Sequence, residues 1–227
     1  MTTSTFTAGL VAMRSGLHPQ ANCDAAVKLI TEANTGGAEY VQTPEMTNIL
    51  AVERDQLFAA IVPEEDDISL ATFREVARSL GIYLHIGSLA IRVSTDKAAN
   101  RSFLIDPKGE IVARYDKIHM FDVDLAGGES YRESHNFRAG DFAVVADLPW
   151  GRLGLTVCYD LRFPRCTAGW RKPAPLSSPF PPPSPNRPAR RTGMCCSAPA
   201  PSRMAPLSFP RRRAANTRTA ARPSAIH

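Results

Sequence analysis

One cysteine of the chain lies where a catalytic nucleophile is expected. Cys158 follows an apolar run at residues 153–157 and precedes Tyr159 and Asp160, a pattern typical of a strand that ends in a sharp turn. Such a turn exposes a side chain beside backbone N–H groups that can stabilise an oxyanion. The position alone is equally compatible with a buried structural cysteine.

Two charged residues could assist a thiol nucleophile. Glu45 comes just after a short apolar run at residues 38–42 and could be a general base, although a solvated carboxylate at a turn is the simpler interpretation. Lys117 could stabilise a tetrahedral oxyanion, or it could be an ordinary surface lysine. Glu133 lies in a charge-rich loop and indicates no role by itself.

Two histidines are alternative bases for a cysteine. His119 and His135 could act as the imidazole does in Cys–His sites. We expect each to be structural or exposed to solvent instead.

The spacing of apolar residues predicts the elements that must position these side chains. Alternating strands and helices indicate an α/β protein whose sheet is covered by other elements. We expect helices from residue 19 to 36 and over 68–80, a hairpin turn at 107–109, a polar loop at 121–140, and strands at 5–13, 38–42, 82–93, 101–106, 111–115, 142–147 and 152–157.

Charge and proline divide the chain in two. Residues 1–165 carry 16 Lys and Arg against 22 Asp and Glu, whereas residues 166–227 carry 11 against none. The second part also holds 13 of the 19 prolines. We therefore expect a globular domain over residues 1–165, followed by an unfolded Pro/Arg-rich tail over 166–227.

Composition also limits the cellular setting and the cofactors. No apolar run reaches the roughly 18 residues of a membrane span, and the polar start is unlike a signal peptide, so we expect a cytoplasmic protein with no membrane partner. The five cysteines, at positions 23, 158, 166, 195 and 196, fit neither a disulfide framework nor a zinc site.

Three motifs, taken in order, resemble the carbon-nitrogen hydrolase, or nitrilase, superfamily. They are Thr43-Pro44-Glu45-Met46-Thr47-Asn48, then Lys117-Ile118-His119-Met120-Phe121-Asp122-Val123-Asp124, then Cys158-Tyr159-Asp160-Leu161-Arg162-Phe163-Pro164. The resemblance covers residues 5–164 and is closest to the amidase branch that includes omega-amidases and deaminated glutathione amidases. It implies the N-terminal part of an α-β-β-α sandwich and a homodimer or larger assembly.

The resemblance also implies a site and a reaction. Glu45 would be the general base, Lys117 the transition-state cation and Cys158 the nucleophile, while Glu133 would help to position Lys117. The backbone N–H of Tyr159 would complete the oxyanion hole. The substrate would be a small carboxylate-bearing amide that is hydrolysed to an acid and ammonia, without a metal or organic cofactor.

The resemblance stops after Pro164, where family sequence should continue. Loss of one base near the codons for Pro164 and Arg165 explains the change, because the shifted frame allows residues 165–180 to encode LYRGLAEAGASFLTV, an amphipathic helix and strand typical of the family. We therefore expect an out-of-frame tail. The alternatives are an inactive truncated product and a basic interaction protein whose arm, centred on Arg211-Arg212-Arg213, attracts phosphate without specificity for a nucleic acid.

The DNA sequence tests the frame directly. We expect the alternative frame to stay open after the Pro164 codon and to continue the family sequence. Resequencing across that codon and through the downstream region checks this. Stop codons or unrelated sequence there would contradict the hypothesis.

Overall fold

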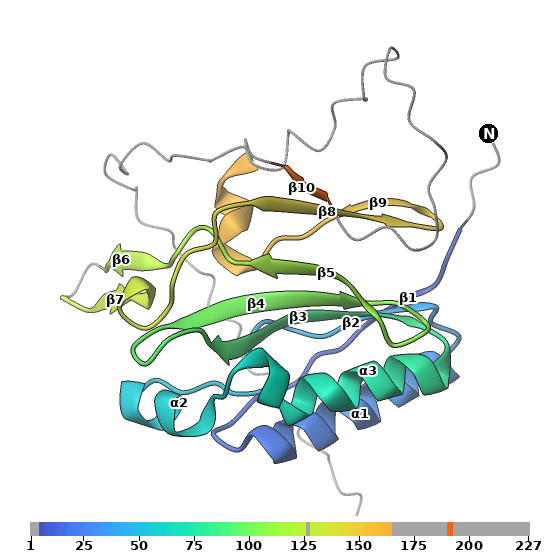
Figure 1. Cartoon of the computed structure of the whole chain (residues 1–227), viewed down its shortest axis with the longest axis horizontal. Helices are drawn as coiled ribbons and strands as arrows, with labels where there is room; N and C mark the ends of the chain where they lie inside the picture. Colours follow the sequence, from blue (N-terminus) through green and yellow to red (C-terminus); the bar gives the residue numbers. More distant parts are fainter. Residues whose placement is uncertain (1–4, 126–127, 165–189, 193–227) are drawn as a thin grey trace, which may run out of the picture. The chain divides into compact units, whose positions relative to one another are not determined.

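The computed structural model describes residues 5–125, 128–164 and 190–192. A five-stranded sheet runs through its centre, with the strands in sequence order and the first three parallel (Figure 1). The remaining pairs are antiparallel. The strands are β1 (Ala8–Leu10), β2 (Tyr40–Gln42), β3 (Tyr83–Arg92), β4 (Ala98–Ile105) and β5 (Ile111–Asp116).

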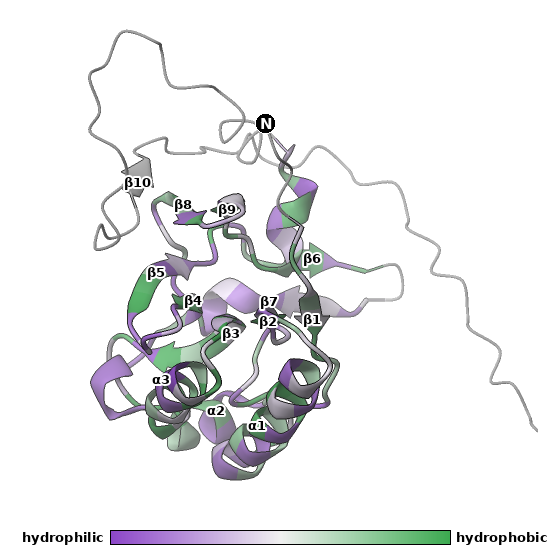
Figure 2. Cartoon of the chain, turned by 90° about the vertical axis from the view of Figure 1, so that its right-hand side faces the viewer, coloured by the Kyte–Doolittle hydropathy of each residue, from purple (hydrophilic) through white to green (hydrophobic). Residues whose placement is uncertain are grey.

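A helical layer covers one face of this sheet. Helices α1 (Pro19–Thr35) and α3 (Ile68–Leu80) lie side by side beneath the strands, where Figure 2 shows them nearly end-on. Ile30 of α1 and Phe73 of α3 are fully buried against β3 and β4. Helix α3 has the predicted bounds and ends at Gly81, whose φ of 66° is the left-handed conformation that glycine adopts without strain.

A second sheet packs on the opposite face. Its strands β8 (Ala143–Leu148) and β9 (Gly151–Gly154) form a hairpin, and Val144 and Leu155 pack against Leu104 and Tyr115 of the first sheet. The described residues therefore form α-β-β layers, which confirms the predicted α/β class and three layers of the expected sandwich (Figure 1).

One described segment differs from the expected unfolded tail. Arg190–Thr192 forms strand β10, antiparallel to β8. The physical reason is the edge of β8, since unpaired backbone groups on an edge strand accept any extended segment. The rest of the predicted tail, residues 166–189 and 193–227, lies outside the described residues.

Several short elements were not predicted. Helix α2 (Arg54–Ala60) and the 3₁₀ turn η1 (Glu64–Asp66) lie between β2 and α3. The expected polar loop contains the hairpin β6 (Asp122–Asp124) and β7 (Ser130–Arg132), followed by the 3₁₀ turn η2 (Glu133–His135). Elements this short do not span enough residues to show a hydrophobic period.

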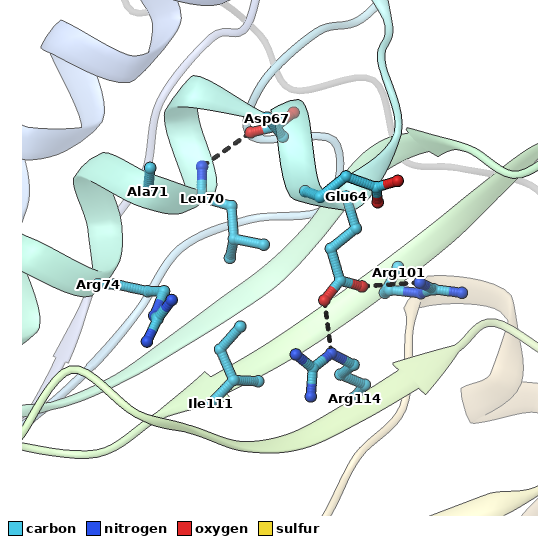
Figure 3. Close-up of a pocket in the computed structure, with 9 residues that line it drawn as sticks. Glu64, Asp67, Leu70, Ala71, Arg74, Arg101, Ile111 and Arg114 are labelled. Carbon is cyan, nitrogen blue, oxygen red and sulfur yellow. Dashed lines mark hydrogen bonds and ion pairs between the residues drawn. The ribbon is translucent and has the colours of Figure 1, made fainter.

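An ion-pair cluster joins η1 to the central sheet. Glu64 accepts from Arg101 at 2.8 Å and from Arg114 at 2.6 Å (Figure 3). Arg101 also pairs with Asp116 at 2.6 Å. Glu64, Arg101 and Arg114 border a hollow of about 460 Å³ beside α3. The paired carboxylates raise the pKa of Arg101 despite its partial burial, so the cluster fastens η1 to β4 and β5.

Candidate active site

The turn that carries Glu45 is joined to the middle of β3. Ser88 donates its backbone N–H to the carbonyl of Pro44 and accepts from the backbone N–H of Thr47 at 2.8 Å. The Ser88 hydroxyl accepts from the backbone N–H of Met46 at 2.9 Å, and Met46 has a φ of 57°. These bonds place Glu45 at the end of β2, as the sequence predicts.

Lys117 lies buried between two carboxylates. Its side chain is 2% exposed, and its Nζ atom is 3.0 Å from Oε1 of Glu45 and 2.9 Å from Oε2 of Glu133. Burial by itself lowers the pKa of the ammonium, but the two carboxylates outweigh that effect and raise it above its ordinary value. Lys117 is therefore a charged cation in the interior, not a surface lysine.

Glu133 reaches the site from η2. Its Oε2 atom accepts the backbone N–H of Phe121 at 2.7 Å. The segment after Glu133 then pairs with the start of β4, where the N–H of Arg138 donates to the carbonyl of Ala98 at 2.8 Å. The structure thus brings the three charged residues, Glu45, Lys117 and Glu133, into one cluster.

Cys158 stands at a strained turn beside this cluster. It is the first residue of the 3₁₀ turn η3 (Cys158–Arg162), it is exposed, and its φ of 47° is uncommon for a non-glycine residue. Its thiol is close enough to Glu45 for that carboxylate to act on its pKa. Partial burial and the charge of Glu45 raise the pKa of the thiol, against the opposing charge of Lys117, so a thiolate forms at neutral pH only when a base takes the proton.

Asp160 holds this turn in place and was not recognised in the sequence. It is 2% exposed; its carboxylate accepts the hydroxyl of Tyr115 at 2.7 Å and the backbone N–H groups of Val157 at 3.0 Å and His119 at 2.9 Å. One carboxylate therefore joins β5, the segment after Lys117 and the cysteine turn. Its position two residues after Cys158 gave no signal of these partners.

The two histidines have the structural or exposed positions expected for them. The His119 ring stacks on Phe163 at 3.7 Å between centroids and contacts Asp160 through Nδ1 at 2.7 Å. His135 is exposed at the end of η2.

Asn100 of β4 is a second residue that the sequence did not indicate. It is fully buried, and its Nδ2 atom donates to Oε1 of Glu45 at 2.8 Å and to Oε1 of Glu133 at 3.2 Å. Its backbone carbonyl accepts the N–H of Lys117 at 2.9 Å. Only the strand alternation could have placed it on the face between the two sheets.

The described residues hold no group of three His, Cys, Asp or Glu side chains placed to bind a metal ion. Within the same ranges, no helix is both long and apolar enough to cross a membrane.

Comparison with known proteins agrees with this geometry. Residues 7–168 match the carbon-nitrogen hydrolase family, to which the chain therefore belongs. It is 40% identical over 159 residues to a deaminated glutathione amidase of Yersinia enterocolitica, covering 68% of this chain and 54% of the relative. It is 33% identical over 161 residues to an omega-amidase of Homo sapiens, covering 70% of this chain and 57% of the relative.

A solved amidase has the same fold. The crystal structure of an amidase from Nesterenkonia sp. aligns with a TM-score of 0.60 and 28% identity, over 73% of this chain and 60% of that one. The chain spans about half the length of the curated relatives it matches.

Gly87 offers a test of how the Glu45 turn is held. A Cβ atom at Gly87 would lie 2.3 Å from the carbonyl oxygen of Thr43 and 2.6 Å from the carbonyl carbon of Pro44. We expect Gly87→Ala to lower the free energy of unfolding by about 1–3 kcal/mol, because backbone must move. Urea denaturation measures this. Gly16→Ala is the control, since its Cβ meets nothing closer than 3.9 Å; equal midpoints for the two variants would contradict the prediction.

Proposed function

We propose that this chain carries the catalytic residues of a Cys-dependent amidase that hydrolyses a small carboxylate-bearing amide to the acid and ammonia. The observation that carries the proposal is the buried Lys117 ammonium between Glu45 and Glu133, beside the Cys158 thiol, whose pKa is raised by Glu45. A nucleophile, its base and a cation for the oxyanion lie together, which is what acyl transfer needs.

In the proposed reaction, Glu45 takes the thiol proton and the sulfur of Cys158 attacks the amide carbon. The charge that develops on the carbonyl oxygen is stabilised by Lys117 and by the backbone N–H of Tyr159. Glu45 then gives its proton to the leaving nitrogen. The C–N bond breaks, ammonia departs, and the acyl group remains on Cys158 as a thioester. Glu45 next removes a proton from water, which attacks the thioester; the acid leaves and the thiol is restored.

The raised pKa of Cys158 supports a base-dependent nucleophile rather than a preformed thiolate. Glu45 lies within hydrogen-bonding reach of the thiol and keeps contact with Lys117. Glu133 holds Lys117 from the other side and so keeps the ammonium in place. The relatives support the amide class: a mutant of the Nesterenkonia amidase carries acrylamide, joined by Michael addition to its active-site cysteine.

We further propose a boundary at residue 165, with an out-of-frame tail over 166–227, and a cytoplasmic location. The charge division and the continuation in the shifted frame support the boundary. The second candidate is an inactive truncated product or a basic-tailed interaction protein, and the +11 charge of the tail favours it.

An ammonia assay separates these candidates. Succinamate, a small amide with a carboxylate, is offered to the chain as it stands and to a chain continued in the restored frame. We expect the restored chain to release ammonia, its Cys158→Ala variant to release none, and the present chain to be at least about 100-fold slower. Butyramide, which lacks the carboxylate, is the matched substrate control.

Each result of the ammonia assay would overturn a different candidate. No ammonia from the restored chain, or full activity of its Cys158→Ala variant, would overturn the amidase proposal. Activity of the present chain equal to that of the restored chain would overturn the inactive candidate. Equal rates with butyramide would overturn the carboxylate-bearing substrate class.

A Glu45→Gln substitution tests the role of the base. The charge of Glu45 raises the pKa of Cys158. Removal of that charge should therefore lower the pKa, so that the thiol ionises at a lower pH. We expect the midpoint of iodoacetamide alkylation to move down by about one pH unit, while ammonia release falls at least about 100-fold. An alkylation midpoint that stays constant or rises would show that Glu45 does not act on the thiol.

A further inference from the structure

We propose that Asn100 is a positioning residue, which holds Glu45 and Glu133 together as a charged pair by donating both hydrogens of its side-chain amide. The inference rests on the proposed function, since it concerns the base of that same site. It assigns a role to a residue of β4 that does not belong to the nucleophile, base and cation set.

The charges of the cluster require a second donor. Glu45 and Glu133 bring two negative charges to one site, and Lys117 supplies one positive charge. Two carboxylates that share a site favour protonation of one of them unless other groups compensate. Asn100 Nδ2 supplies that compensation, because it lies 2.8 Å from Oε1 of Glu45 and 3.2 Å from Oε1 of Glu133.

The same two oxygens also accept from Lys117. Oε1 of Glu45 and Oε1 of Glu133 are each 3.0 Å from Nζ. The amide and the ammonium thus both bridge the carboxylates. The two residues are also joined through the backbone, because the carbonyl of Asn100 in β4 accepts the N–H of Lys117, the residue that follows β5. These two bridging groups hold Glu45 and Glu133 at a fixed distance from each other.

The Asn100 amide destabilises the fold through its oxygen, which indicates that its function is to bind the two carboxylates. Asn100 is fully buried, and its Oδ1 atom has no hydrogen-bond partner within the described parts of the chain. A buried acceptor without a partner is destabilising, whereas an apolar side chain of similar size would fill the place without that loss. What the amide gains is the pair of bonds to Glu45 and Glu133.

The two carboxylates would respond differently to loss of the amide. Glu133 keeps the backbone N–H of Phe121 at 2.7 Å as well as Lys117. Glu45 is more exposed, at 30% against 13% for Glu133, and keeps only Lys117 and the thiol of Cys158 among its contacts in the described residues. Glu45 therefore loses a larger share of its hydrogen-bond donors than Glu133 does.

The test uses the full chain and observes the carboxylates directly. Glutamate labelled with ¹³C at the side-chain carboxyl is titrated by NMR in the native chain and in Asn100→Leu, and the Glu45 and Glu133 signals are assigned with Glu45→Gln and Glu133→Gln. We expect the Glu45 midpoint in Asn100→Leu to rise by about one pH unit, the effect of one lost bond to a charged group. The Glu133 midpoint should move less.

Ser102→Ala is the matched control. Ser102 is fully buried two residues further along β4, and its hydroxyl contacts His85 and the carbonyl of Ile86 instead of the carboxylates. We expect both midpoints to keep their native values in this variant. Asn100→Ser, which is smaller and retains one donor, should give an intermediate shift if Asn100→Leu does not fold.

The outcomes separate the inference from the function. Native midpoints in a folded Asn100 variant, even with a lower melting temperature, would overturn the positioning role. Where ammonia release is observed, the acid limb of kcat/KM should move with the Glu45 midpoint, so that the rate falls about tenfold below it. A shifted Glu45 midpoint together with absence of ammonia from the chain continued in the restored frame would overturn the amidase proposal and leave the role of Asn100 supported.

Discussion

A buried ammonium between two carboxylates is the constraint on which the rest of the structure depends. Lys117 is 2% exposed, and such a charge is strongly destabilising in a protein interior unless opposite charges compensate it. Its partners come from remote parts of the chain: Glu45 from the turn after β2 and Glu133 from η2. The fold must therefore bring three separate segments to one place, and the bonds of Ser88, Ala98 and Phe121 to these segments meet that requirement.

The Cys158 turn is joined to the same segments by a second buried carboxylate, Asp160. Asp160 accepts from Tyr115 of β5, from the backbone after Lys117 and from the backbone before Cys158. Any shift of the lysine segment would therefore move the cysteine turn with it. This coupling sustains the positive φ of Cys158, a conformation that persists only where the surroundings determine it. Two carboxylate networks, one around Lys117 and one around Asp160, thus fix the positions of Glu45, Lys117 and Cys158 relative to one another.

Other elements cover both faces of the central sheet. The central sheet is covered on one face by α1 and α3, and on the other by β8 and β9 (Figure 1). β8 pairs with β9 on one edge and with the three residues of β10 on the other. This chain spans about half the length of the carbon-nitrogen hydrolase relatives it matches.

The sequence by itself determined the order of the main helices and strands, the family resemblance and the four residues Glu45, Lys117, Glu133 and Cys158. It could do so because periodic apolar positions and short motifs are local properties of the chain. The short elements after Gln42 and within residues 121–140 lack such a period. The long-range contacts of Asn100 and Asp160 were decided by tertiary structure alone, since Glu45 and Glu133 lie more than thirty residues from Asn100, and Tyr115 and His119 lie more than thirty residues from Asp160. Hydrogen-bond partners at that separation are chosen by the packing of the sheets, and no local pattern encodes them.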